Sequence, residues 1–243
     1  MKIVILGATS PVGSYLSYHM ADHDVRLLLH GRDDNKVSDL EQSITNDKPD
    51  SDIGRFVFDY QNPDSVTTEC KRLVEEEGNV DILINCSFGQ HEESIDNSSA
   101  AEIYEFYTAA LSGPATAISA LLPALRNSHD GKIINIVADW GIPMHNIMTG
   151  PALYISGKYG AHGLGAGLQS ELGKFKIRTT NIFPGIIEVG EISVATPNPK
   201  VPSSQEGIHP DELVRSVKFV IEAKTAHTKS IVLSPTNPEY NGL

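Results

Sequence analysis

The sequence predicts a doubly wound α/β fold, in which a parallel sheet of seven strands carries helices on both faces. Short, β-branched apolar runs alternate with longer segments that are compatible with helices, as repeated βαβ units require. The runs are continuously apolar, which is typical of strands buried on both faces of a parallel sheet. The expected strands are Ile3–Leu6, Val25–Leu29, Arg55–Phe58, Asp81–Asn85, Lys132–Val137, Arg178–Phe183 and Ser230–Leu233.

The 243 residues are expected to form one nucleotide-binding domain, residues 1–243, without internal repeats. One composition shift stands out at about 190–210, where Pro197, Pro199, Pro202 and Pro210 occur among few large hydrophobic residues. Long segments of this kind are usually functional loops or linkers. Too little chain follows for a second domain, so a loop over the substrate pocket is favoured over a linker.

Composition excludes several classes of partner. The net charge is −12 and no Lys/Arg-rich run occurs, so we expect no nucleic-acid partner. The run Ile3–Leu6 is too short for a membrane span or a signal peptide, and no later stretch is apolar over about 18 residues. Cys70 and Cys86 form no metal motif or disulfide framework, and the nine histidines lack a metal-ligand pattern. We therefore expect a cytoplasmic protein without a metal or a membrane partner.

The first predicted strand runs into a glycine-rich turn, Gly7–Gly13, and then into a segment compatible with a helix. Such a turn presents backbone N–H groups and the positive end of a helix dipole to a pyrophosphate. Pro11 lacks an N–H, so one potential donor is missing. An ordinary strand-to-helix turn is the alternative. The cofactor-binding residues expected here are Gly7, Thr9, Ser10, Val12 and Gly13.

Arg32 follows the second predicted strand, 19 residues after Gly13. An acidic residue at about this distance would bind the ribose 2′-hydroxyl of NAD, whereas an arginine suits the 2′-phosphate of NADP. The planar guanidinium can grip a phosphate with two hydrogen bonds. The sequence therefore predicts NADP(H), and a solvated surface arginine is the alternative.

Tyr154 and Lys158 are four residues apart, so on a helix they share one face. A nearby cation favours the phenolate, and we expect it to lower the pKa of Tyr154 so that the hydroxyl can exchange a proton near neutrality. The spacing alone is a weak signal, since surface pairs on helices produce it as well.

The order of these motifs resembles the classical short-chain dehydrogenase/reductase family, from Lys2 to about Gly190. The matching positions are Gly7–Gly13, Asp59, Asn85, Tyr154 with Lys158, and Pro184–Gly185. The resemblance implies a Rossmann-type fold. It also implies that Tyr154 is the catalytic acid/base, that Lys158 holds the nicotinamide ribose and that Asp59 contacts adenine. The other cofactor contacts that it implies are Tyr60, Asn85, Cys86, Ser87, Pro184, Gly185 and Ile187.

Two positions depart from the family pattern. Ala138 stands where the catalytic serine is usual, and Ala110 stands where a helical asparagine supports a water relay. Losing an oxyanion donor can cost a factor of about 10²–10³ in rate where nothing replaces it.

Asp139 is the candidate replacement for the serine, because residues 135–140, 86–88 and 111–114 are similar to pteridine-reductase-like members that use an aspartate. Asp139 lies 15 residues before Tyr154, farther than in that subgroup, so a shift or bulge would be needed to aim it. A solvated or helix-capping aspartate is the alternative. Thr149 and His145 are the other candidate donors.

The sequence thus indicates an NADP(H)-dependent oxidoreductase that reduces a carbonyl or imine of a small molecule, or catalyses the reverse oxidation. Two alternatives stay open: a non-redox enzyme on the same scaffold (a dehydratase, isomerase or cyclase), and a non-catalytic NADP(H)-binding protein. The resemblance further implies a homodimer or homotetramer.

Overall fold

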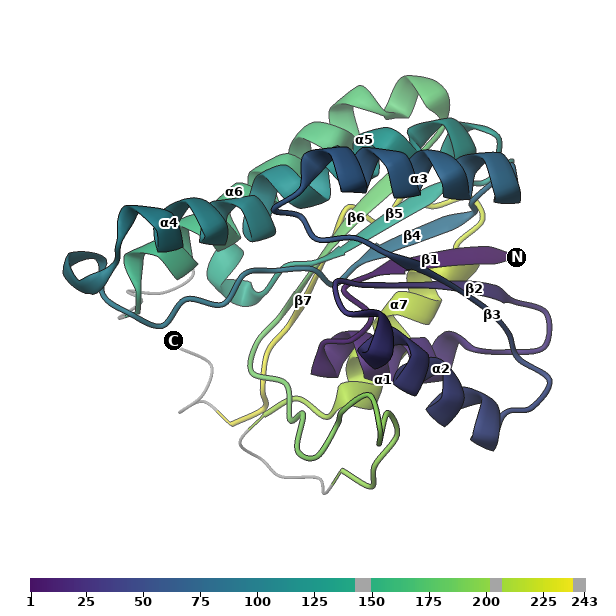
Figure 1. Ribbon diagram of the computed structural model, residues 1–243, viewed down its shortest axis with the longest axis horizontal. Coiled ribbons are helices and arrows are strands. Elements are labelled where there is room, and N and C mark those ends of the chain that lie inside the picture. The colour runs from purple at the N-terminus through teal and green to yellow at the C-terminus, as the bar shows by residue number, and fades with distance from the viewer. Residues whose placement is uncertain (143–149, 202–206, 238–243) are drawn as a thin grey trace.

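The computed structural model describes residues 1–142, 150–201 and 207–237 (Figure 1). Seven strands form one sheet in the order β3-β2-β1-β4-β5-β6-β7, and every pairing is parallel. This confirms the predicted fold class. The strands are β1 Lys2–Leu6, β2 Arg26–Gly31, β3 Asp52–Val57, β4 Ile82–Asn85, β5 Lys132–Ile136, β6 Arg178–Pro184 and β7 Ser230–Leu233.

Helices cover both faces of the sheet (Figure 1). One face carries α1 Pro11–Met20, α2 Asp34–Asp47 and α7 Pro210–Glu222. The other carries α3 Pro63–Glu77, α4 Ala100–Tyr107, α5 Gly113–Arg126 and α6 Ala152–Glu171. The chain crosses from β3 back to β4 beside β1, so the connections from β1 and β4 leave toward opposite faces. The crevice at the carboxyl ends of two such strands is where ligands bind in open α/β sheets.

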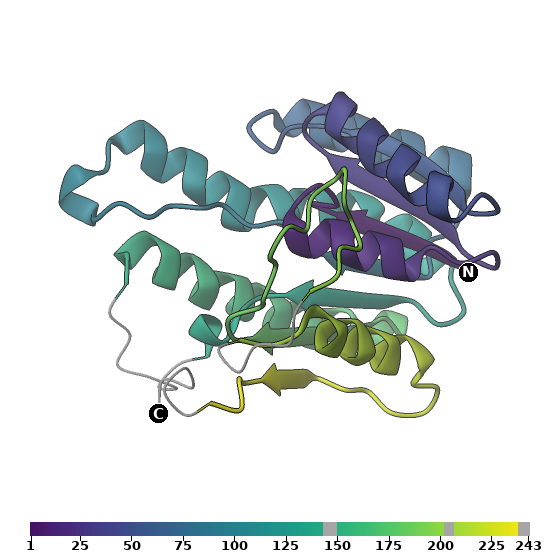
Figure 2. The same ribbon diagram turned by 90° about the horizontal axis from the view of Figure 1, so that it is seen from below.

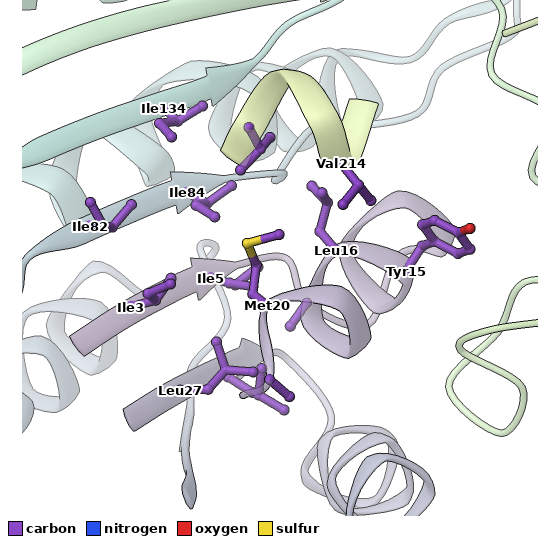
Figure 3. Close-up of a cluster of buried hydrophobic side chains, with 14 of the residues drawn as sticks. Ile3, Ile5, Tyr15, Leu16, Met20, Leu27, Ile82, Ile84, Ile134 and Val214 are labelled. Atoms are coloured by element: carbon purple, nitrogen blue, oxygen red, sulfur yellow. The ribbon is translucent and has the colours of Figure 1, made fainter. Parts of the chain in front are cut away.

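Two hydrophobic cores fix this arrangement. Below the sheet, Ile3, Ile5, Ile82 and Ile84 pack with Leu16 of α1 and other side chains of the first core (Figure 3). The opposite face of the sheet packs against α3 and α5 in the second core. Each central strand is therefore apolar on both sides, which explains its continuous apolar run.

A polar row interrupts the apolar sheet at its ligand-binding edge. Asn85, Asn135 and Asn181 are register partners on β4, β5 and β6. Asn85 Nδ2 donates to Asn135 Oδ1 at 3.5 Å, and Asn135 Nδ2 donates to Asn181 Oδ1 at 3.1 Å. Asn85 Oδ1 accepts from the backbone N–H of Ser87 at 3.1 Å. The row therefore links the turn after β4, the central strand, to β5 and β6.

The helical stretch Ala100–Arg126 is long and apolar enough to cross a membrane by length and composition. That is weak support for a span, since core helices of soluble proteins pass the same test. Ile118, Leu121 and Leu125 are fully buried in the second core, which accounts for the apolar composition. A π-helical turn at Thr108–Ser112 connects α4 to α5 and contains Ala110, which is buried.

The segment after β6 lies along α1, as Figure 2 shows. Its residue Ile192 is buried in the first core. Asn198 Oδ1 lies 3.1 Å from His19 Nε2, and the Ala195 carbonyl lies 3.5 Å from Ser43 Oγ of α2. The described part of the predicted substrate loop, residues 190–201, thus packs on α1 and α2, and residues 202–206 lie outside the described residues. A role of this loop in substrate binding stays a prediction.

Candidate nucleotide and catalytic site

The turn after β1 has the geometry expected of a phosphate-binding turn. Gly7 has φ +72°, and a Cβ there would lie 3.0 Å from backbone atoms of Ser87. A Cβ on Gly13 would lie 2.2 Å from the Gly7 carbonyl oxygen. Only glycine fits both positions, because one needs a left-handed backbone and the other a close backbone approach.

Ser10 organises the start of α1. Its Oγ accepts from the Gly13 N–H at 3.0 Å and donates to the Gly7 carbonyl at 2.9 Å. Pro11 is the first residue of the helix, where an N–H has no partner within the helix, so proline costs the helix little. The amino end of α1 thus points into the crevice with its dipole oriented to favour an anion.

His30 supports the same turn, a role that the sequence reasoning missed. The Gly7 N–H donates to His30 Nδ1 at 3.2 Å, so Nε2 carries the proton and donates to the Phe58 carbonyl at 3.2 Å. The imidazole stacks on the Phe58 ring with centroids 3.8 Å apart. Burial lowers the pKa of His30 to about 4, so it is neutral at physiological pH. A histidine at the end of an apolar strand is the sequence signal for such a structural role.

A cavity of about 720 Å³ opens beside the turn. Of the predicted cofactor residues, its lining includes Gly7, Thr9, Ser10, Arg32, Asp59, Tyr60, Cys86 and Ser87. Sequence reasoning did not include Lys36, Gln61, Gln90, His91, Glu102 and Glu105, which also line it. These side chains come from the start of α2, the ends of β3 and β4, and α4, so only the tertiary fold brings them together.

One end of this cavity is basic. Arg32 and Lys36 both line it and are exposed. Neither makes an ion pair within the described ranges of the chain, and the adjacent Asp33 caps α2 by accepting from the N–H groups of Asn35 and Lys36. Two cations without a carboxylate partner can both face an anionic group in the cavity.

The opposite wall is formed by Tyr60 and Ser87, whose hydroxyl oxygens are 2.7 Å apart. Tyr60 packs on α5, where a Cβ on Gly113 would lie 2.4 Å from its ring. Burial raises the pKa of Tyr60 and raises that of Cys86 to about 12, so both stay protonated at neutral pH. This wall is therefore neutral and can contact an uncharged base.

Tyr154 and Lys158 lie on one face of α6. Lys158 is 6% exposed, and its Nζ donates to the Val137 carbonyl at 2.7 Å. The Nζ lies 5.2 Å from the Tyr154 ring centroid and 3.4 Å from that of Phe88. The Tyr154 ring makes edge contacts with Phe88 and with Trp140, at centroid distances of 5.4 and 5.5 Å. The phenol therefore lies between two aromatic side chains.

Asp139 joins this pair through an unusual backbone. Ala138 has φ 140° and ψ 157°, a region that glycine alone adopts easily, at a cost of about 1–3 kcal/mol. The strained residue starts a short 3-10 turn, Asp139–Gly141. Asp139 Oδ2 lies 3.2 Å from the position that a Cβ on Gly185 would take, and its charge acts on Tyr154 and Lys158. The local distortion that the sequence spacing required is present at Ala138.

The pKa shifts correct one expectation. Burial raises the pKa of Tyr154, and the Asp139 carboxylate raises it further. Burial lowers the pKa of Lys158 to about 7, while Asp139 acts in the opposite direction. The expectation of a lowered pKa for Tyr154 is therefore wrong for this geometry, because burial of the phenol and the Asp139 carboxylate both raise it.

The remaining predicted residues lie near the same edge of the sheet. Pro184 ends β6 and Gly185 follows it beside Asp139. Val12 and Ile187 share an apolar crevice with Ile192 of the following segment. The lining of the 720 Å³ cavity does not include six of the predicted cofactor residues: Val12, Gly13, Asn85, Pro184, Gly185 and Ile187. Thr149 and His145 lie outside the described residues.

Within the described parts of the chain, no group of three or more His, Cys, Asp or Glu side chains is placed to hold a metal ion. Asp139 and the cavity carboxylates Asp59, Glu102 and Glu105 are thus not gathered into a ligand set.

Several curated relatives are uncharacterized oxidoreductases. An uncharacterized oxidoreductase of Staphylococcus saprophyticus is 29% identical over 186 residues, which cover 76% of this chain and 77% of that protein. An uncharacterized oxidoreductase of Staphylococcus aureus strain N315 is 22% identical over 233 residues, 96% of each chain.

Solved structures share the fold at low identity. An alcohol dehydrogenase from Thermococcus sibiricus, complexed with 5-hydroxy-NADP, has a TM-score of 0.81 and 20% identity, covering 99% of this chain and 100% of that one. A metagenomic short-chain oxidoreductase in complex with NADP has a TM-score of 0.79 and 21% identity over 98% and 97% of the two chains. At such identities the likeness concerns the fold.

The family model for short chain dehydrogenases matches residues 1–198, which include the phosphate-binding turn, the strained turn at Ala138 and the Tyr154–Lys158 pair. The chain therefore belongs to the short-chain dehydrogenase/reductase family of oxidoreductases.

Proposed function

We propose that this protein is an NADP(H)-dependent reductase of a carbonyl or imine in a small molecule, or the corresponding dehydrogenase. The observation that carries the proposal is the placement of Tyr154 and Lys158. Both lie on one face of α6, and Lys158 donates to the Val137 carbonyl just after β5, at the sheet edge that also holds the turn after β1. A dinucleotide that lies across this edge would reach both ends of the site.

The choice of NADP(H) over NAD(H) rests on the basic end of the cavity. Arg32 and Lys36 would face the 2′-phosphate of the adenosine ribose, and Asp33 is engaged as the cap of α2. Structural neighbours from Thermococcus sibiricus and from the metagenome contain 5-hydroxy-NADP and NADP, which is consistent with this choice.

The cofactor, when bound, supplies or accepts the hydride. In the reductive direction the Tyr154 hydroxyl donates a proton to the substrate oxygen or nitrogen while the adjacent carbon gains the hydride, so that the carbonyl becomes an alcohol or the imine an amine. Phe88 and Trp140 flank the phenol, which is half-buried. Burial keeps Tyr154 protonated, which suits a proton donor.

Asp139 is the proposed third member of the catalytic set. Ala138 offers no side-chain donor, whereas Asp139 is close enough to influence the charge state of both catalytic side chains. We assign Asp139 the place that the serine has in the family pattern, next to the phenol that exchanges the proton.

A second candidate is a non-redox enzyme, or a non-catalytic binding protein, on the same scaffold. The two alanines at positions 110 and 138 favour it, because each stands where the family pattern has a polar side chain of the catalytic set. Both versions predict NADPH binding without net NADPH consumption. We further propose a cytoplasmic homodimer or homotetramer, which sedimentation of the purified protein tests.

Calorimetric titration with NADPH and with NADH tests the cofactor site. We expect NADPH to bind more tightly, and Arg32→Ala to lose about tenfold or more in NADPH affinity with little change for NADH. Arg215→Ala is the matched control, because Arg215 is an exposed arginine on α7 that pairs with Glu212. Equal binding of both nucleotides, or equal loss in both variants, would refute NADP(H) preference.

Substrate screening by NADPH absorbance, with panels of aldehydes, ketones and cyclic imines, tests catalysis. Tyr154→Phe should abolish turnover while NADPH binding persists. Tyr159→Phe is the control on the same helix, since Tyr159 is an exposed neighbour outside the site. Turnover that survives in Tyr154→Phe would exclude the phenol as the proton donor.

A further inference from the structure

The ring of Phe88 lies directly on the ammonium of Lys158. The Nζ is 3.4 Å from the ring centroid, which is within the range of a strong cation–π contact. An ammonium has three N–H groups. One of them donates to the Val137 carbonyl, and the Phe88 ring covers another side of the nitrogen.

Phe88 also belongs to the lining of the 720 Å³ cavity, together with the phosphate-binding turn, Arg32 and Asp59. Among the described lining residues of that cavity, neither Tyr154 nor Lys158 is included. Phe88 lines the cavity and also contacts the Lys158 ammonium. Its ring therefore lies between the cavity, which is proposed above to hold the adenosine half of the cofactor, and the Tyr154–Lys158 pair.

Several contacts keep the ring in this place. Phe88 makes edge contacts with Tyr154 at 5.4 Å and with Phe106 at 5.7 Å between centroids. A Cβ on Gly157 would lie 3.2 Å from the tip of the Phe88 ring, so the glycine makes room for it on α6. The ring is nevertheless only half-buried, so a ligand that enters the cavity can displace it.

We propose that Phe88 is a gate for the cofactor. Its ring occupies the side of Lys158 that a nicotinamide ribose must reach, so a dinucleotide has to displace the ring in order to bind. This inference rests on the proposed function, because it assumes a dinucleotide that spans both halves of the cleft. A ligand confined to the adenosine half would bind without moving the ring. The gate thus couples full engagement of the cofactor to the exposure of the catalytic lysine.

The low pKa of Lys158, about 7, agrees with this arrangement, because an aromatic ring and a single carbonyl replace water around the ammonium. Displacing the ring in favour of ribose hydroxyls would restore hydrogen-bonding partners to the ammonium.

The test compares two ligands on two proteins by calorimetry. Adenosine 2′,5′-bisphosphate fills only the adenosine half, and NADPH fills both halves. In Phe88→Ala we expect NADPH to bind about 3- to 30-fold more tightly, because the cation–π contact no longer has to be broken, whereas the bisphosphate should change by less than about twofold. Phe88→Leu keeps the bulk without the π face and should give part of the gain, which protects the test if the alanine variant folds poorly.

Trp140→Leu is the matched control, since Trp140 touches Tyr154 in the same edge geometry, whereas the rings that face the Lys158 ammonium in the described part of the chain are those of Phe88 and Tyr154. A gain for NADPH that appears in Phe88→Ala and not in the control supports the gate. Unchanged or weakened NADPH binding in Phe88→Ala, or an equal change for both ligands, overturns it. If the wild-type protein binds both ligands but Phe88→Ala gives one of the two contradicting results, the gate alone is refuted. If the wild-type protein binds neither ligand, the proposed function is refuted and the gate with it.

Discussion

Replacing Lys158 by methionine should stabilise the protein at pH 6, although it removes a residue of the proposed catalytic set. The pKa of Lys158 falls from 10.5 to about 7, mainly through burial, and that difference corresponds to about 5 kcal/mol of penalty for the buried ammonium. Methionine leaves the Val137 carbonyl without its donor, which offsets about 1–3 kcal/mol of that relief. Methionine has similar length and no charge, so we expect a net gain of about 2–4 kcal/mol.

The stabilising effect of Lys158→Met should depend on pH. Between pH 7 and 10.5 the folded chain holds fewer protons at Lys158 than the unfolded chain does, so the stability of the wild type rises with pH in this window. The advantage of Lys158→Met should therefore shrink between pH 6 and pH 9.5, as measured by guanidinium denaturation at each pH.

Lys132→Met is the matched control, because Lys132 is equally buried but pairs with Asp130 at 2.9 Å and donates to the Ile221 carbonyl. Removing the lysine breaks one of the two ion pairs of Asp130, the other being with Arg178, and leaves the Ile221 carbonyl without its donor, so this variant should lose stability at both pH values. A loss of more than about 1 kcal/mol in Lys158→Met at pH 6 would refute the reasoning, since it would mean that the site stabilises the ammonium more than water does.

Three further outcomes follow from the packing and the charges. Gly165→Ala should cost about 2–4 kcal/mol in chemical denaturation, because its Cβ would lie 2.0 Å from the Asn181 amide oxygen, whereas Gly167→Ala has open space and should gain up to about 1 kcal/mol; equal effects would contradict the packing of α6. The pKa of His30, about 4 instead of 6.5, means that unfolding takes up a proton below pH 6.5, so about 3 kcal/mol of stability should be lost as pH falls to 4, and a His30→Asn variant should lack this part of the slope. Asp139→Asn removes the charge that raises the pKa of both catalytic side chains, so the limbs of the pH–rate profile should move to lower pH, and an unmoved profile would place the carboxylate outside the site.

The fold could be predicted because its central strands are apolar on both faces. All seven predicted strands are present, and the largest boundary error falls on β3, which begins at Asp52 instead of Arg55. β3 is an edge strand that pairs with β2 alone, so its first residues need not be apolar and give no hydrophobic signal. The predicted glycine turn has the required geometry because Gly7 and Gly13 fill positions that only glycine can fill.

The contacts that decide the chemistry could not be predicted in the same way. The contact of Phe88 with Lys158 joins the end of β4 to α6, and no spacing in the sequence encodes it. The pKa of Tyr154 was misjudged because the i,i+4 pattern shows the neighbouring cation but not the burial of the ring. The prolines of the loop after Gly190 gave no sign that Ile192 is buried in the first core, and a role of this loop in substrate binding stays a prediction.

Trp140 is the only tryptophan of the chain, and its ring lies 5.5 Å from that of Tyr154. All tryptophan emission therefore originates at the catalytic end of the cleft, with no background from the rest of the fold. A reduced nicotinamide absorbs in the range where indole emits, so its arrival next to Tyr154 would quench this signal, whereas a ligand held only at the Arg32 end would leave it nearly unchanged. The protein thus carries an intrinsic optical reporter that distinguishes full cofactor engagement from partial binding without any added label.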